Sequence, residues 1–167
     1  MALKADRYEF QTDISFFSDS AVATRGGVVV HDGTTASGAA MDQGVNKVME
    51  EAVTAASIPV GILLNDIVNK DLTRTHINHY KDEVQLGGKV TVLRKGWVVT
   101  NRVTHTPAIS VGDVAYACHI TKGNIRGDSP GNSGDLAIGR FLTGKDEDGY
   151  CKVEVNLPNL NAGVNVS

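Results

Sequence analysis

Aromatic residues and cysteines are both scarce in this chain. Of its 167 residues 5% are aromatic, and the two thiols belong to Cys118 and Cys151. A core must therefore be built mainly from Val, Ile, Leu and Ala. Each cysteine lies in a strand-like run beside apolar neighbours, so we expect buried free thiols, because a zinc site needs closer ligand spacing. A domain of this length buries roughly 70% of its unfolded surface and needs neither disulfide nor metal to fold.

Basic character and long apolar runs are also missing. The formal net charge is −3, and the longest basic cluster is Arg94-Lys95, so we expect no direct contact with nucleic acid. No apolar run approaches the ~20 residues of a membrane helix, and the first eight residues have no apolar core of a signal peptide. No glycine-rich dinucleotide motif or Walker loop is present, so we expect no cofactor.

Alternating apolar and polar residues are what the chain has in quantity. They predict a β-hairpin over residues 136–157, around a charged turn with two glycines. A second hairpin is predicted over residues 89–103, with a turn near Lys95-Gly96, and a third unit over residues 111–124. Trp97 follows the second turn and is predicted to be buried in the core. Together these units predict one all-β domain, a small β-barrel or sandwich.

The rest of the chain divides around that domain. We expect an extended N-terminal arm over residues 1–20, the domain over residues 21–157 and an extended tail over residues 158–167. Residues 32–44 are small and polar and predict a long loop. Residues 45–56 have apolar side chains at helical spacing, but strand pairing can override that preference, so one short helix and a strand both stay open.

Two segments are candidates for contacts with a neighbouring subunit or partner. The arm carries more aromatic side chains than so short a segment can bury by itself, so it either forms an edge strand or docks on a neighbour. Residues 65–80 have no clean period and hold two histidines three apart, which suits a polar contact loop better than an incomplete metal site. The candidate interface residues are Tyr8, Phe10, Ile14, Phe16, Phe17, Arg74, His76 and His79.

One motif could carry chemistry. The sequence Gly-Asn-Ser-Gly around Ser133 is similar to the nucleophile loop of trypsin-like serine proteases, and His31 with Asp66 or Asp71 would complete a triad. Against this, Asp135 stands where that family typically has glycine, and its carboxylate would oppose the developing negative charge. We therefore expect a loop here, no catalytic or metal-binding residues, and no enzyme.

Several phrases stand in order along residues 58–157. They are Pro59-Val-Gly-Ile-Leu-Leu-Asn-Asp-Ile-Val68, Lys81-Asp-Glu-Val-Gln-Leu-Gly-Gly-Lys-Val90, Leu93-Arg-Lys-Gly-Trp97, Val111-Gly-Asp-Val-Ala-Tyr116, Ile138-Gly-Arg-Phe-Leu142, Lys145-Asp-Glu-Asp-Gly-Tyr150 and Val153-Glu-Val-Asn-Leu157. In this combination the chain resembles the capsid decoration (cement) proteins of tailed bacteriophages.

The resemblance implies a non-enzymatic virion protein that binds the outer surface of a phage capsid and stabilises it. It implies the major capsid protein as partner and self-association, commonly as a homotrimer. An acidic chain suits the outer surface better than a lumen packed with DNA, and reduced cysteines suit assembly in the host cytoplasm. The alternatives are a compact serine hydrolase using Ser133 and a cytosolic β-barrel adaptor.

Overall fold

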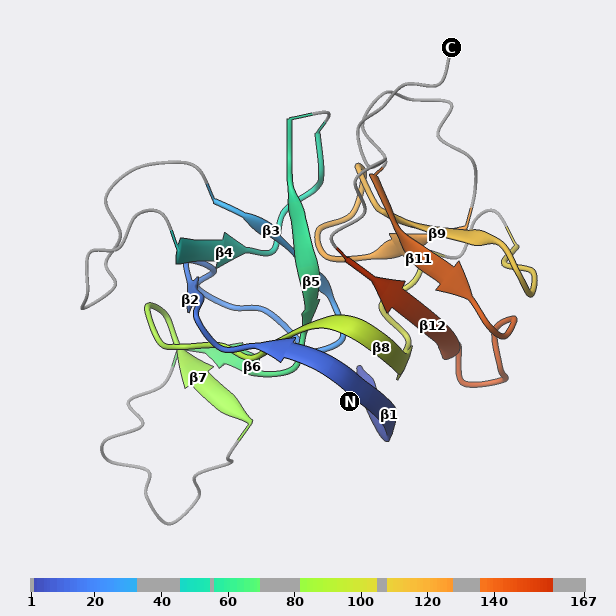
Figure 1. Cartoon of the computed structure of the whole chain (residues 1–167), viewed down its shortest axis with the longest axis horizontal. Helices are drawn as coiled ribbons and strands as arrows, with labels where there is room; N and C mark the ends of the chain where they lie inside the picture. The colour runs from blue at the N-terminus through green and yellow to red at the C-terminus, as the bar shows by residue number, and fades with distance from the viewer. Residues whose placement is uncertain are drawn as a thin grey trace.

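The computed structural model describes residues 2–32, 46–54, 56–69, 82–104, 108–127 and 136–157. In these ranges the chain forms strands and turns and no α-helix (Figure 1). The strands are β1 (Leu3–Asp13), β2 (Phe17–Ser18), β3 (Val28–His31), β4 (Lys47–Met49), β5 (Pro59–Leu63), β6 (Asp66–Val68), β7 (Glu83–Gln85), β8 (Val92–Thr100), β9 (Val114–Ala117), β10 (Ile125–Arg126), β11 (Leu136–Phe141) and β12 (Cys151–Asn156).

Strand β8 organises the sheet because three strands pair with it. The strand order is β10-β9-β11-β12-β8-β5-β3-β4-β2, with β1 also paired to β8. Along one edge of β8, β12 pairs with residues 95–100 and β5 pairs with residues 92–93. Along the other edge of β8, β1 pairs from Val92 to Thr100.

The sheet therefore divides at β8 into two groups of strands. Figure 1 shows β9, β11 and β12 on one side and β2 to β5 on the other. Strand β10 is the last strand of the group that contains β9, β11 and β12. A bridge between its Ile125 and Val103, just after β8, places β10 back beside β8. The result is a sandwich-like all-β fold, and the small parallel pair β6–β7 forms a separate sheet.

The core lies on both faces of the central strands. Val28 and Val30 of β3 contact the larger apolar cluster with Ile62, whereas Val29 contacts the smaller cluster with Leu63. Strands buried on both faces read as continuous apolar runs. In the outer strands β11 and β12 buried and more exposed side chains alternate, which is typical of a sheet with one solvated face.

Two of the predicted hairpins are confirmed. Strands β11 and β12 pair antiparallel as expected for residues 136–157, and β9 pairs antiparallel with β10 across the turn at residues 122–124. The predicted turn near Lys95-Gly96 is wrong, because β8 continues through both residues. Gly96 has φ +141°, and a Cβ there would lie 2.0 Å from the carbonyl oxygen of Tyr8, so this glycine permits close strand pairing rather than a turn.

The helical alternative for residues 45–56 is also wrong. Residues 47–49 form β4, which pairs with β3 and with β2. The Lys47 side chain is 1% exposed, and its amine lies 3.1 Å from a carboxylate oxygen of Asp19 and 3.2 Å from one of Asp32. Burial acts to lower the pKa of Lys47, but the hydrogen bonds to the two aspartates raise it overall. These pairings override the helical spacing.

Candidate interaction surface on the N-terminal strand

The N-terminal segment forms an edge strand of its own domain, one of the two arrangements expected for it. Strand β1 runs antiparallel to β8 from Leu3, opposite Thr100, to Asp13, opposite Val92. The Ala2 carbonyl accepts hydrogen bonds from Thr100 Oγ1 at 3.1 Å and from the Asn101 amide at 3.0 Å. The segment is therefore held by β8 at Leu3, over residues 7–9 and over residues 11–13.

The five predicted contact residues of this segment divide into two groups. Tyr8, Phe10 and Ile14 are 54%, 70% and 62% exposed. Phe16 is half-buried and packs against the smaller apolar cluster, and Phe17 is buried. The last two therefore anchor the end of the segment in the domain. We name the three exposed residues, Tyr8, Phe10 and Ile14, the β1 apolar surface.

A bulge lies in the middle of this surface. The register of β1 against β8 shifts between Glu9 and Gln11, so Phe10 is the extra residue. Gly96 of β8 lies opposite Glu9. Bulges twist a strand and redirect side chains, which accounts for the exposed position of Phe10. The pairing has two further register shifts, between Leu3 and Arg7 and between Gln11 and Thr12.

Trp97 extends the apolar surface sideways and is not a core residue, contrary to the sequence-based prediction. Its neighbour Val98 is fully buried, and side chains alternate along a strand, so Trp97 faces outward and is half-buried. Lys152 of β12 places its amine 3.3 Å from the centroid of the Trp97 ring. In register, Trp97 lies between Tyr8 and Glu154.

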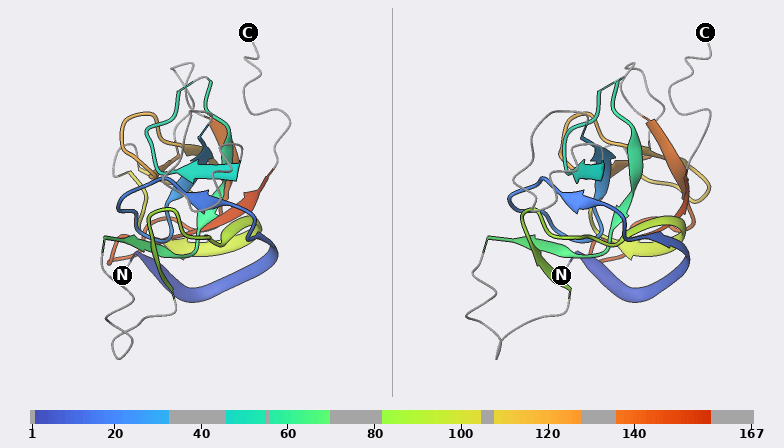
Figure 2. Two further views of the ribbon diagram at one scale, coloured as in Figure 1. Left: turned by 90° about the vertical axis from the view of Figure 1, so that its left-hand side faces the viewer. Right: turned by 60° about the vertical axis from the view of Figure 1, so that its left-hand side comes forward.

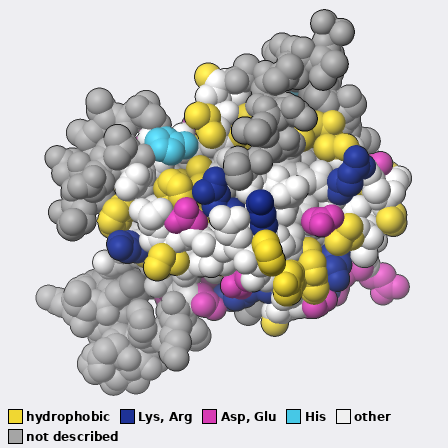
Figure 3. Space-filling view, in the orientation of Figure 1, with side chains coloured by type: hydrophobic (Ala, Val, Ile, Leu, Met, Phe, Trp, Pro, Cys, Tyr) yellow, Lys and Arg dark blue, Asp and Glu magenta, His cyan; other side chains and the backbone are white. Residues whose placement is uncertain are grey.

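Trp97 and Lys152 were missed as surface residues, although a signal for them existed. If the strand passes through Gly96 without a turn, successive side chains point to opposite faces. Because Val98 faces the core, Trp97 then faces outward. Figure 3 shows hydrophobic side chains grouped where β1 runs beside β8, with Lys or Arg and Asp or Glu side chains around them. Such a mixed apolar and charged surface is typical of protein interfaces.

An ion pair fixes the first half of β1 to the turn before β12. Lys4 Nζ lies 2.9 Å from Asp146 Oδ2 and 4.2 Å from the centroid of the Tyr150 ring. The hydrogen bond between these side chains raises the pKa of Lys4 and lowers the pKa of Asp146. Asp146 Oδ1 also accepts hydrogen bonds from the backbone amides of Tyr150 and Asp148.

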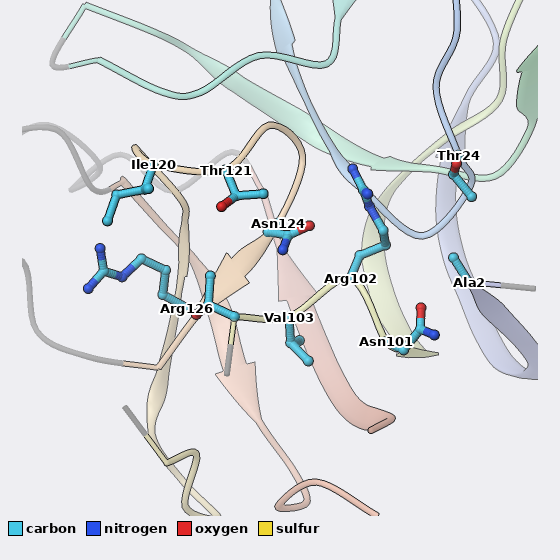
Figure 4. Close-up of a pocket in the computed structure, with 10 residues that line it drawn as sticks. Ala2, Thr24, Asn101, Arg102, Val103, Ile120, Thr121, Asn124 and Arg126 are labelled. Carbon is cyan, nitrogen blue, oxygen red and sulfur yellow. The ribbon is translucent and has the colours of Figure 1, made fainter. Parts of the chain in front are cut away.

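A second candidate surface is an open cavity of about 690 Å³ beside β10, which is more polar than the β1 apolar surface. Arg102 and Arg126 lie on opposite sides of Asn124 there (Figure 4). Arg102 is engaged within the protein, because it donates to Glu50 and, at 2.8 Å, to the Lys122 carbonyl. Burial raises the pKa of Glu50, and the adjacent Arg102 opposes that shift.

The residues considered for catalysis are not brought together in the described part of the chain. Both carboxylate oxygens of Asp66 face Arg25, one accepting from its amide at 2.9 Å and the other 3.5 Å from Nε. His31 lies on β3 and lines a different cavity, with Asp32. Ser133 and Asp71 lie outside the described residues, as do Arg74, His76 and His79.

Metal and thiol chemistry find no support in the described ranges. No group of three or more His, Cys, Asp or Glu side chains is placed there to hold a metal ion. Both cysteines are free and buried, as predicted. Burial raises the pKa of the Cys151 thiol. Within the same ranges, no helix has the length and apolar character to cross a membrane.

The chain matches the model of a known family. The model of a family described as structural cement protein (E217 gp24/Pam3 gp6) matches residues 8–156, from Tyr8 in β1 to the end of β12. No curated protein matches the sequence.

Proposed function

Because this chain belongs to the structural cement protein family of phages, and so is a virion structural protein that stabilises the capsid, we propose that it binds the outer surface of the shell through the β1 apolar surface. The match begins within β1 and includes all three residues of this surface. The sequence resemblance to capsid decoration proteins, found from other segments, supports the same role.

The observation that carries this proposal is the exposure of large apolar side chains on, and directly after, a strand that is paired with β8. Phe10 and Ile14 are 70% and 62% exposed, although Phe10 lies between residues paired with β8 and Ile14 directly follows Asp13, the last paired residue. Leaving such side chains in water forgoes roughly 1.5–3 kcal/mol each. Contact residues that are already ordered lose little conformational entropy on binding, so they suit a stabilising contact.

We further assign the partner and the assembly state. The partner is the major capsid protein, and the net charge of −3 suits the outer surface better than the DNA-filled interior. The protein forms a homotrimer, as is common among the proteins it resembles. Residues 1–20 act as the contact segment and residues 21–157 as the structural domain, while the tail expected over residues 158–167 lies outside the described residues. Arg74, His76 and His79 add polar contacts.

Binding to phage heads that lack the protein tests the role of the β1 apolar surface. Phe10→Ser and Ile14→Ser should reduce binding at least tenfold in co-sedimentation while leaving the melting temperature within about 2 °C of the wild type, because both side chains are exposed. Val111→Ser is the matched control, since Val111 is 72% exposed on another part of the domain. Wild-type binding by both β1 variants would contradict the proposal.

The assembly state needs a separate measurement. Light scattering of the purified protein should give three times the mass of the chain. If the protein is a monomer and still binds heads, the proposed homotrimer is wrong and the proposed binding to the capsid is retained. A protein that ignores heads at every concentration would contradict the proposed binding surface and the outer-surface location together.

A further inference from the structure

Strand β1 has one edge that no other described strand covers. It is 11 residues long and pairs with β8 alone. Both views in Figure 2 show β1, in blue, as a long curved strand along the outside of the molecule. A free strand edge presents unpaired amides and carbonyls, which can pair with a strand of another chain.

The direction of the backbone groups decides which residues can pair there. The Tyr8 carbonyl is directed at β8, because a Cβ on Gly96 would lie 2.0 Å from its oxygen. Successive residues of a strand direct their backbone groups to opposite edges. Arg7 and Glu9 therefore present theirs to the free edge, one on each side of Tyr8.

Arg7 and Glu9, the two neighbours of Tyr8, have opposite charges. We infer that the free edge of β1 pairs antiparallel with β1 of a second copy of this chain, with Tyr8 at the two-fold axis. In that register Arg7 lies opposite Glu9 of the second copy, and both are residues that present backbone groups to the free edge. Within one copy Arg7 Nε already lies beside Glu9 Oε1, so in this contact each side chain gains a further oppositely charged neighbour from the second copy. Each cross-strand pair then combines two backbone hydrogen bonds with opposite charges.

The same register also continues a row of side chains across the sheet. Within one copy Glu154, Trp97 and Tyr8 are successive neighbours on β12, β8 and β1. The two-fold axis places Tyr8 beside Tyr8 of the second copy, so Trp97 and Tyr8 of both copies form one aromatic row. Aromatic cross-strand pairs stabilise sheets.

Two neighbouring registers lose these features. A shift that places Arg7 on the axis sets Ala5 opposite Glu9 and Asp6 opposite Tyr8, so no opposite charges meet. A register centred between Asp6 and Arg7 sets a residue facing the free edge against one facing β8, which breaks the hydrogen-bond alternation. Of these three registers, the one centred on Tyr8 sets opposite charges against each other and keeps the hydrogen-bond alternation.

An antiparallel contact of a strand with its own copy joins two subunits around a two-fold axis. It is distinct from the three-fold contact proposed above and would join neighbouring trimers. The inference deepens, and rests on, the proposed role of the N-terminal segment. Its test uses the isolated protein, so failure here leaves capsid binding standing, and failure to bind heads leaves this contact standing.

Disulfide cross-linking of the full chain tests the contact. Tyr8→Cys should give a covalent dimer on non-reducing gels under mild oxidation, because residues on the axis lie directly opposite each other. Gln11→Cys is the matched control: it is also exposed on β1, but the register separates the two copies of residue 11 by roughly 20 Å. The native thiols Cys118 and Cys151 are buried, so they leave the background low.

Charge reversal in the Tyr8→Cys protein then tests the register. Arg7→Glu and Glu9→Arg should each lower the dimer yield at least fivefold, since like charges then face each other. Their equimolar mixture, and the double variant, should restore it. Equal cross-linking of Tyr8→Cys and Gln11→Cys, or a mixture that cross-links no better than the single variants, would overturn the inference.

Discussion

The Lys152 amine lies 3.3 Å from the centroid of the Trp97 ring, on the face of the sheet that points away from the core. This contact links β12 to β8 and shields part of a large aromatic side chain without burying it. It is the reason that Trp97 can remain at the surface beside Tyr8.

Replacing Trp97 should destabilise the protein only modestly. Trp97→Ala removes a half-buried ring and a cation–π contact, so we expect a loss of about 1–2 kcal/mol in the free energy of unfolding. Phe141→Ala is the comparison, because Phe141 is fully buried and should cost about 3–5 kcal/mol. Urea denaturation measures both. Equal losses of unfolding free energy in the two variants would show that Trp97 is a core residue after all.

Gly96, the one glycine of β8, should be sensitive to the addition of a side chain. Gly96→Ala brings a Cβ to 2.0 Å from the Tyr8 carbonyl oxygen at φ +141°, so β1 must shift away from β8. Gly149→Ala is the control, because its φ is also positive, at +82°, but nothing lies within 4 Å of the added carbon.

We expect the control to cost about 1 kcal/mol from backbone strain alone, and Gly96→Ala to cost clearly more. Hydrogen exchange should also accelerate in the amides that β1 and β8 share, in the Gly96 variant only. Similar stabilities and similar exchange in the two variants would show that the approach of Tyr8 to Gly96 is not restrictive.

Acid should weaken the attachment of β1 through Asp146. The hydrogen bond from Lys4 lowers the pKa of Asp146 below its ordinary value of 3.8. A carboxyl group with a lowered pKa in the folded state contributes stability above its unfolded pKa and loses that contribution as the pH falls through the folded pKa. Asp146→Asn should therefore show a shallower loss of stability below about pH 4.

Melting temperatures between pH 2 and 7 measure this effect. Asp148→Asn is the matched control, because it makes the same change of charge in the same turn but does not remove the bond to Lys4. The acid dependence of the control should follow the wild type. If both variants changed that dependence equally, general charge rather than the Lys4–Asp146 pair would be responsible.

No serine hydrolase activity is expected. The family is structural, and Asp66 faces Arg25 rather than serving a histidine. A fluorophosphonate probe should leave the purified protein unlabelled at stoichiometric concentration, and Ser133→Ala should behave identically. Stoichiometric labelling that disappears in the Ser133→Ala protein would require an enzymatic role beside the structural one.

The sequence allowed the outer strands to be predicted better than the central ones. Strands β11 and β12 face solvent on one side, so their alternation is visible in the residues themselves. Burial of Val28 to Val30 on both faces removes that alternation. The helical spacing of residues 45–56 was a local signal, and it was overridden by Lys47 and its two aspartates, which are distant in sequence.

Gly96 shows the same limit for the interaction surface. A glycine between two alternating runs fits a turn and a close strand pairing equally well. The difference is made by Tyr8, whose place beside Gly96 depends on a pairing between distant segments. The exposed side chains of β1 could be named from the sequence because the segment is short and aromatic-rich, whereas the outward position of Trp97 followed only from the correct path of β8.

The pairing of β1 with β8 also sets the order of events during synthesis. Thr100 donates to the Ala2 carbonyl across 98 residues of sequence, so at translation rates of about 5–20 residues per second the first strand waits roughly 5–20 s for its partner. Throughout that interval Tyr8 and Phe10 lack the pairing with β8 that positions them in the folded protein. The contact surface proposed on β1 is therefore completed only after Thr100 has been synthesised.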